Sequence, residues 1–162
     1  MPTPTQIDVK SGDNLLLVGT TKGAFLFRSQ AQRGNWEEAG PYFPGRSVYA
    51  LAHDGRNGRN KLWAAVNSPY WGSFLSSSDD FGKTWSNPET YNIKFPEGSD
   101  VSLKQIWQIA EGHPGDSDTL FCGVEPAALF KSTDAGETWA LERGLFDHPH
   151  RTQWMPGGGG LC

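Results

Sequence analysis

Short apolar segments separated by turn-forming residues run through most of this chain. Segments at 48–53, 61–66 and 74–77 are separated by signals such as Asp54-Gly55 and Asn57-Gly58. A second set at 106–110, 119–124 and 128–131 surrounds the turn residues at 113–116. Segments of this length, bounded by Gly, Pro, Asn and Asp, are typical of antiparallel strands joined by tight turns. The pattern therefore predicts an all-β fold.

The chain also contains an internal repeat, and a repeat decides the architecture. Residues 78–85 and 132–139 both fit Ser-x-Asp-x-Gly-x-Thr-Trp, and we expect a further strand to open at Trp85 and at Trp139. A weaker first copy runs through 15–19, 23–29 and 34–36, and keeps the serine and tryptophan but not the aspartate. Each unit has three or four short strands, which is the strand count of a propeller blade. We therefore expect blades at about 12–41, 46–90 and 104–143, with 144–162 leading into a further blade.

The octapeptide has the residues of a turn that satisfies its own hydrogen bonds. An aspartate in a tight turn accepts bonds from nearby backbone amides, the serine hydroxyl does the same, and glycine supplies a positive φ. The threonine begins the outgoing strand, and the tryptophan covers its apolar face. This structural assignment takes in Ser78, Asp80, Gly82, Thr84, Trp85, Ser132, Asp134, Gly136, Thr138 and Trp139. Two alternatives stay open: the aspartates as calcium ligands or catalytic acids, and the tryptophans as platforms for sugar rings.

Composition and charge narrow the class of protein. The 162 residues suit one domain with its own core. The 20 Gly, 11 Pro and 12% aromatic residues favour short strands and many turns over long helices. A formal charge of -4 and a pI near 5.5 offer no basic face for a phosphate backbone, which disfavours a nucleic acid partner.

Signals for membrane targeting, disulfides and metals are weak in this sequence. It begins without the basic and apolar regions of a secretory signal, and no apolar run approaches the ~20 residues of a membrane span. We therefore expect a soluble, cytoplasmic protein with no membrane partner. Cys122 and Cys162 are too few for a disulfide scaffold or a zinc site, and His148 and His150 lack further spaced ligands. We expect no disulfide, no metal and no cofactor.

The two octapeptides resemble the Asp-box, or bacterial neuraminidase repeat, of sialidases, sortilin-type receptor domains and other bacterial propellers. With the weaker copy, the resemblance covers nearly the whole chain. It implies a β-propeller of four-stranded antiparallel blades, about three of them present, with the box as a structural turn remote from the active site. Because a propeller needs about four to eight blades to close, we expect this chain to be the N-terminal part of a larger ring. The alternative is that two copies associate through their open edges.

We expect a site on the face opposite the octapeptide turns, where the other loops of the blades meet. Loops carry function more often than the scaffold that holds them, and polar and aromatic groups gather at the mouth of a binding channel. Arginine binds a carboxylate or phosphate through two hydrogen bonds, and glutamate acts as an acid, as a base or as a cation's partner. The candidates are Lys22, Arg46, Tyr70, Trp71, Glu125, Arg151 and Trp154. The alternative is a set of solvated or mutually paired charges.

Two functions of different classes follow from these observations. The first is a binding scaffold whose channel face takes a glycan, a small acidic molecule or a protein. The second is a sialidase-type glycoside hydrolase. For that function the resemblance implies an Arg-Ile-Pro motif, an arginine triad that binds the substrate carboxylate, an aspartate that acts as the acid and a Tyr-Glu nucleophile pair. The nearest match to the first motif is Phe43-Pro44-Gly45-Arg46, which supplies an arginine without the motif. The sequence assigns no catalytic residue.

Overall fold

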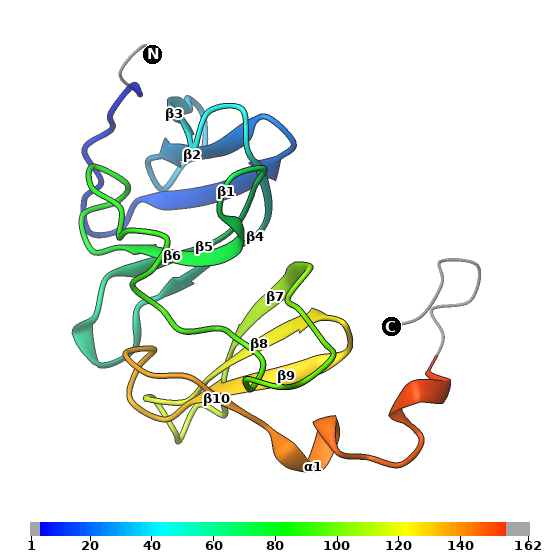
Figure 1. Ribbon diagram of the computed structural model, residues 1–162. Coiled ribbons are helices and arrows are strands. Elements are labelled where there is room, and N and C mark those ends of the chain that lie inside the picture. The colour runs from blue at the N-terminus through cyan, green and yellow to red at the C-terminus, as the bar shows by residue number, and fades with distance from the viewer. Residues whose placement is uncertain (1–3, 155–162) are drawn as a thin grey trace.

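Three antiparallel β-sheets follow one another along residues 4–154, the part of the chain that the computed structural model describes (Figure 1). Sheet 1 contains β1 (Asn14–Thr20), β2 (Gly23–Ser29) and β3 (Glu37–Tyr42). Sheet 2 contains β4 (Ser47–Asp54), β5 (Lys61–Ser68) and β6 (Gly72–Ser78). Sheet 3 contains β7 (Gln105–Glu111), β8 (Leu120–Glu125), β9 (Ala128–Ser132) and β10 (Ala140–Leu141). Within each sheet, every strand pairs with its neighbour in sequence, and the predicted all-β class is confirmed.

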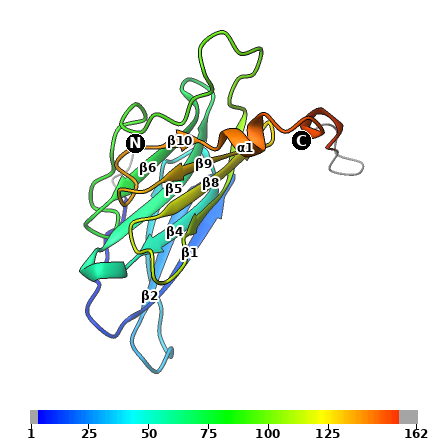
Figure 2. The ribbon, with the colours of Figure 1, turned by 90° about the horizontal axis from the view of Figure 1, so that it is seen from below.

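The sheets stack face to face because the middle sheet is apolar on both sides. Successive residues of a strand point to opposite faces. In β5, Leu62, Ala64 and Val66 pack in the layer shared with sheet 1, whereas Trp63 and Ala65 pack in the layer shared with sheet 3. Figure 2 looks along the stack and shows the strands of the three sheets overlapping with a similar slant. The continuous apolar run of β5 thus reflects its place between two neighbours.

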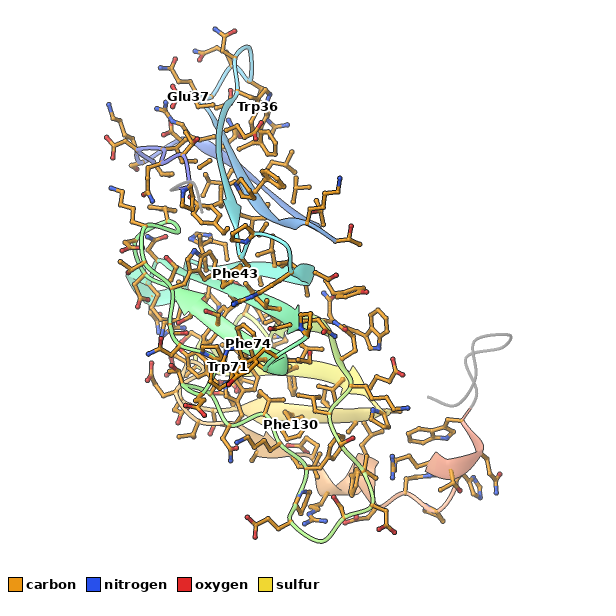
Figure 3. All side chains as sticks on the ribbon, turned by 45° about the horizontal axis from the view of Figure 1, so that its top comes forward. Trp36, Glu37, Phe43, Trp71, Phe74 and Phe130 are labelled. Carbon is orange, nitrogen blue, oxygen red and sulfur yellow. The ribbon has the colours of Figure 1, made fainter. Side chains whose placement is uncertain are left out.

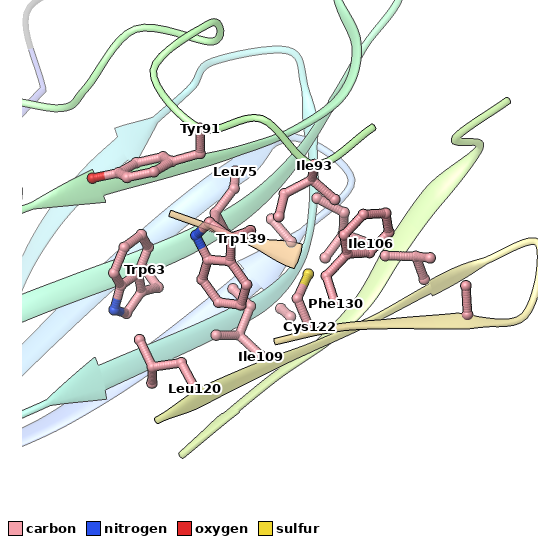
Figure 4. Packing of buried hydrophobic residues seen from close by; sticks show 14 residues of the cluster. Trp63, Leu75, Tyr91, Ile93, Ile106, Ile109, Leu120, Cys122, Phe130 and Trp139 are labelled. Carbon is pink, nitrogen blue, oxygen red and sulfur yellow. The ribbon is translucent and has the colours of Figure 1, made fainter. Parts of the chain in front are cut away.

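The apolar layer between sheets 2 and 3 is centred on tryptophan (Figure 4). The Trp63 side chain is 0% exposed, and its ring lies edge-on to those of Tyr91, at 5.0 Å between centroids, and Trp139, at 6.0 Å. Phe130 of sheet 3 is buried in the same layer. Burying a side chain of this kind contributes about 1.5–3 kcal/mol, so this layer is a main source of stability.

An ion network around the buried Asp54 joins sheets 2 and 3 at the end of the strands that carries the octapeptide turns. Asp54, 1% exposed, accepts hydrogen bonds from Arg56 at 2.9 Å and Arg59 at 3.1 Å. Arg56 also donates to the carbonyl of Thr119 at 3.2 Å, and Arg59 donates to the carboxylate of Asp118 at 2.8 Å. Burial raises the pKa of Asp54, but the hydrogen bonds from Arg56 outweigh burial and leave it below its ordinary value. The network fixes the β4–β5 turn, which contains the 3₁₀ helix η1 (Arg56–Gly58), against sheet 3.

Sheet 3 has the four predicted strands, but sheets 1 and 2 have three each, so the four strands per blade that the resemblance implies are found only in sheet 3. In sheet 2 the strand predicted to open at Trp85 does not form. The Ser86 N–H donates to the Ser77 carbonyl at 2.8 Å, but the Ser77 N–H donates to the Ser86 hydroxyl instead of a backbone carbonyl. Pro88 follows and has no N–H with which to extend a ladder. The chain then runs without regular structure to β7.

Short helices follow sheet 3. They are α1 (Arg143–Phe146) and the 3₁₀ helix η2 (Arg151–Gln153), and Figure 1 shows them leading away from the sheets. The predicted lead-in to a further blade therefore has no strand in 144–154, and its remainder, with Cys162, lies outside the described residues. Cys122 is buried in sheet 3. No helix of the described residues is long and apolar enough to cross a membrane.

Candidate functional site

The two octapeptide turns, 78–85 and 132–139, form matching hydrogen bonds. Ser78 Oγ donates to Asp80 Oδ1 at 2.8 Å and accepts the N–H of Gly82 at 2.8 Å. Asp80 also accepts the N–H of Thr84 at 2.8 Å and its hydroxyl at 2.7 Å. The second turn repeats each of these four bonds between the equivalent residues. Gly82 has a φ of 87°, so the bonds and the backbone are those that the residue spacing predicts.

The aspartate carboxylates of these turns are occupied by their own turns. The hydroxyl and amide of Thr138 hold the pKa of Asp134 below its ordinary value. Burial raises the pKa of Asp80, but bonds from Thr84 and Ser78 outweigh it and leave that pKa lowered too. Among residues 4–154 there is no group of three or more His, Cys, Asp or Glu side chains placed to hold a metal ion. We therefore interpret both aspartates as structural.

Each octapeptide turn also docks on the preceding sheet. A Cβ atom on Gly136 would lie 2.3 Å from Cζ2 of Trp63, so the turn approaches sheet 2 more closely than any side chain allows. Trp139 packs on the same ring and is 9% exposed. In the first turn, Trp85 lies edge-on to Phe43 with ring centroids 4.8 Å apart, and Figure 3 shows Phe43 between sheets 1 and 2. These tryptophans therefore pack between sheets.

The weaker first copy of the turn, at 29–36, lacks these contacts. Ser29 is 2% exposed, yet its hydroxyl has no hydrogen-bond partner, because Ala31 stands where the other turns have aspartate. Trp36 is 43% exposed and lies in the loop between β2 and β3, at the end of sheet 1 far from sheet 2 (Figure 3). The loss of the aspartate thus leaves a buried hydroxyl unsatisfied, and no sheet among residues 4–154 precedes sheet 1 to cover the tryptophan.

Five of the predicted site residues lie at the strand ends opposite the octapeptide turns: Lys22, Arg46, Tyr70, Trp71 and Glu125. Lys22 is exposed in the β1–β2 turn, and its carbonyl accepts the N–H of Gly45 at 3.0 Å. Arg46 follows Gly45 and immediately precedes β4, so the two cations lie in adjoining loops. Glu125 ends β8, and its carboxylate accepts the indole N–H of Trp107 at 3.2 Å instead of pairing with a cation.

Tyr70, Trp71, Arg151 and Trp154 make other contacts. Tyr70 and Trp71 form an edge-to-face pair on the β5–β6 turn, and Trp71 lines a separate cavity of about 260 Å³ against the connection that follows sheet 2. Arg151 lies over the ring of Phe146, 4.3 Å from its centroid, and donates to the carbonyl of Ala127 at 3.4 Å. Trp154 packs on the ring of His148, with centroids 5.5 Å apart. None of the other six candidates lines the cavity beside Trp71.

Two aromatic residues that the sequence interpretation missed lie beside Glu125. Tyr49 and Trp107 occupy equivalent β-bulges near the beginnings of β4 and β7. Each is 49% exposed, and their rings meet edge-on with centroids 5.2 Å apart. A bulge adds one residue to a strand and re-aims its side chain. Here both bulges turn a large ring into solvent at the boundary between sheets 2 and 3.

Two amide side chains complete this group. Gln105 is the register partner of Glu125 and is 6% exposed. Its Oε1 accepts a hydrogen bond from Asn67 Nδ2 at 2.9 Å, and its Nε2 donates to the Ile106 carbonyl at 3.0 Å. We call the set of Tyr49, Asn67, Gln105, Trp107 and Glu125 the aromatic edge site. It combines two half-exposed rings with a carboxylate and two amides fixed by hydrogen bonds.

A signal for the missed pair is present in the repeat. Val48-Tyr49 and Ile106-Trp107 both place an aromatic residue directly after the first buried apolar residue of the first strand of a unit. A single strand pattern hides this, because alternation alone assigns the side chain after a buried residue to the opposite face. Superposing the units would have singled out the aromatic position.

No protein-family model matches this chain, and a search of curated proteins finds no match either. The geometry of the aromatic edge site is therefore the basis for a functional proposal.

Proposed function

We propose that the three sheets are blades of an Asp-box β-propeller that acts as a binding scaffold. Three features support this. The sheets are successive antiparallel meanders stacked face to face, their octapeptide turns recur at matching points, and each complete turn docks on the preceding sheet. The inner strands are then β4 and β7, because they lie at the edges of their sheets farthest from the octapeptide turns and their outgoing chain. Tyr49 and Trp107 would line the channel.

The ligand we propose for the aromatic edge site is a glycan. A sugar ring has apolar C–H faces that pack on aromatic rings, and hydroxyl groups that need hydrogen-bond partners. Trp107 and Tyr49 offer half-exposed ring surface, and the bond from the Trp107 indole to Glu125 fixes the orientation of the larger ring. A few polar groups placed beside an apolar surface are what orient a small ligand. The exposed ring pair beside the Glu125 carboxylate is the observation that carries this proposal.

The charged loops beside the site bear on the kind of glycan. Lys22 and Arg46 lie in adjoining loops at the same strand ends. A cation of this kind binds a carboxylate on a sugar by charge-assisted hydrogen bonds. We therefore expect acidic glycans, including sialosides, to bind at least as tightly as their neutral counterparts.

A glycan array with the purified chain tests the proposal, followed by calorimetric titration of the glycans that bind. We expect Trp107→Ala to weaken binding at least tenfold, which corresponds to about 1.4 kcal/mol, and Glu125→Gln to weaken it less. Trp71→Ala is the matched control, since Trp71 is 46% exposed but lines a different cavity. Absence of glycan binding, or equal binding by Trp107→Ala and wild type, would contradict the proposal. Release of a fluorescent leaving group from a sialoside would instead favour the sialidase-type alternative.

A further inference from the structure

A small polar cavity lies at the loop that joins β2 to β3, which is the counterpart in sheet 1 of the complete octapeptide turns. Its volume is about 260 Å³. Since a water molecule takes up about 30 Å³ of liquid water, this cavity is large enough for a small organic molecule. The lining consists of one glycine and six residues with polar side chains: Arg28, Ser29, Gln30, Gln32, Gly34, Asn35 and Glu37. Figure 3 labels Glu37, one of these residues, and we call the space the sheet 1 cavity.

The Ser29 hydroxyl is a buried group of this cavity without a hydrogen-bond partner among residues 4–154. In the complete turns the equivalent serine hydroxyl donates to an aspartate carboxylate, at 2.8 Å in the first turn and 2.7 Å in the second. It also accepts the N–H of the turn glycine. In sheet 1 the corresponding N–H, that of Arg33, donates instead to the carbonyl of Gln30 at 2.9 Å. An unsatisfied buried hydroxyl is costly, so a ligand that accepts its proton is favoured at this position.

The complete turns define the chemical group that suits this hydroxyl. There the acceptor is a carboxylate, which also accepts the backbone N–H and the hydroxyl of a threonine. In sheet 1 the residue at the threonine position is Asn35, and it lines the cavity. Ala31 stands at the aspartate position, so the turn has no carboxylate of its own there. Because a hydroxyl bonds more strongly to a charged acceptor than to a neutral one, the carboxylate of a ligand is the expected partner of Ser29.

The charged residues that line the cavity are Arg28 and Glu37. The Arg28 guanidinium donates to Asp13 through Nε at 2.7 Å and through Nη2 at 3.2 Å, and to Glu37 through Nη1 at 3.0 Å. The side chain of Asp13 is 7% exposed, whereas that of Glu37 is 60% exposed and has room to turn into solvent. An anionic ligand therefore competes with Glu37, the more weakly held of the two carboxylates, for the positive charge of Arg28.

We propose that the sheet 1 cavity binds a small hydroxycarboxylate. The ligand's carboxylate accepts the Ser29 hydroxyl, in place of the aspartate that the other two turns supply. Its hydroxyl groups bond to the amide side chains of Gln30, Gln32 and Asn35, which offer both donors and acceptors. This site lies at the strand ends opposite the aromatic edge site, so the glycan proposal and this one do not depend on each other.

Calorimetric titration of the purified chain with glycerate tests the proposal. Glycerol is the matched control ligand, because it has the same carbon chain with a hydroxymethyl group in place of the carboxylate. We expect one glycerate to bind per chain in the millimolar range, and glycerol to bind at least tenfold more weakly. The Tm should rise with glycerate concentration at constant ionic strength, since a ligand that binds the folded chain alone stabilises it. Absence of glycerate binding, or equal affinity for glycerol, would overturn the proposal.

Single substitutions locate the bound glycerate. Ser29→Ala removes the hydroxyl donor without breaking a hydrogen bond of the folded chain, so it should fold normally and bind glycerate at least tenfold more weakly. Ser117→Ala, in the β7–β8 turn, is the matched control and should bind as the wild type does. Glu37→Gln should bind at least threefold more tightly, because it removes the competing charge. Equal binding by Ser29→Ala and the wild type, or no gain from Glu37→Gln, would contradict the proposed site.

Restoring the aspartate gives the converse test. Ala31→Asp together with Arg33→Gly and Asn35→Thr rebuilds the octapeptide, so that the chain's own carboxylate bonds to Ser29. Glycerate should then bind at least tenfold more weakly and no longer raise the Tm. A triple variant whose turn is closed, as slower amide exchange at position 35 would report, but which binds glycerate as tightly as the wild type would refute the proposal.

Discussion

Completing the octapeptide turn of sheet 1 is expected to stabilise the protein. Residues 29–36 read Ser-Gln-Ala-Gln-Arg-Gly-Asn-Trp, and the substitutions Ala31→Asp, Arg33→Gly and Asn35→Thr restore Ser-x-Asp-x-Gly-x-Thr-Trp. The strands on either side pair at positions equivalent to those that flank the turn of sheet 3. The loop therefore has the length of a complete turn, and no insertion is needed.

The expected gain follows from two local defects. The buried Ser29 hydroxyl has no partner, and an unsatisfied buried polar group costs about 1–3 kcal/mol. Arg33 has a φ of 55°, in the left-handed region that costs about 1–2 kcal/mol for a residue with a side chain. Glycine at position 33 would remove this cost, but its greater freedom in the unfolded chain would cancel about 0.5–1 kcal/mol of the gain. The substitution would also remove the hydrogen bond from Arg33 to Asn14. We expect a net gain of about 1–3 kcal/mol, or about 2–4 °C in Tm for each kcal/mol.

Urea and thermal denaturation of the wild type and the triple variant measure this gain. A control with Ala31→Asn and the same changes at 33 and 35 keeps the shape of the turn but lacks the charged acceptor, so it should gain less. Amide exchange should become slower at position 35, since the carboxylate introduced at position 31 would accept the N–H of position 35 as Asp80 accepts that of Thr84. A triple variant no more stable than the wild type would refute the view that these eight residues specify the turn by themselves.

Three further predictions test the core, the turns and the buried thiol. Trp63→Ala should cost about 3–5 kcal/mol by urea denaturation, against at most about 0.5 kcal/mol for the exposed Trp71→Ala; equal costs would place Trp63 outside the core. Because the folded-state pKa of Asp134 is lowered by Thr138, its contribution is complete above the unfolded value of about 3.9 and is lost as pH falls through the lower folded value. Asp134→Asn should therefore make the free energy of unfolding depend less steeply on pH between pH 4 and pH 2 than in the wild type. A slope equal to that of the wild type would contradict this. Burial raises the pKa of Cys122 to about 12, so a Cys162→Ser variant should react with a thiol reagent at pH 8 only after unfolding, and rapid native labelling would contradict its burial.

The sequence predicted the features of this fold that depend on nearby residues. The turn at 132–139 closes through bonds between residues at most four positions apart, so its spacing is enough to specify it. The strand segments of sheets 2 and 3 were recognisable because each is apolar and bounded by turn residues. The missing fourth strand of sheet 2 had a local signal as well, in the proline at position 88, which the repeat obscured.

The candidate site was harder to predict because it depends on neighbouring sheets. The position of Glu125 on the face opposite the octapeptide turns followed from the strand order, but its partner, Trp107, is exposed only because of a bulge. Whether an arginine contributes to a site depends on which other groups its guanidinium can contact. The Arg151 guanidinium lies over the ring of Phe146 and donates to the carbonyl of Ala127, and a strand pattern reveals neither contact.

The central claim is that the aromatic edge site binds a glycan, and an NMR titration tests it most directly. The indole N–H signals of a ¹⁵N-labelled chain, assigned by single substitutions, would be followed as an acidic oligosaccharide such as sialyllactose is added. We expect a saturable shift of the Trp107 signal, because its indole N–H bonds to Glu125 within the site, and no shift of the Trp71 signal. A shift confined to Trp71, or no shift of Trp107 at millimolar oligosaccharide, would contradict the claim.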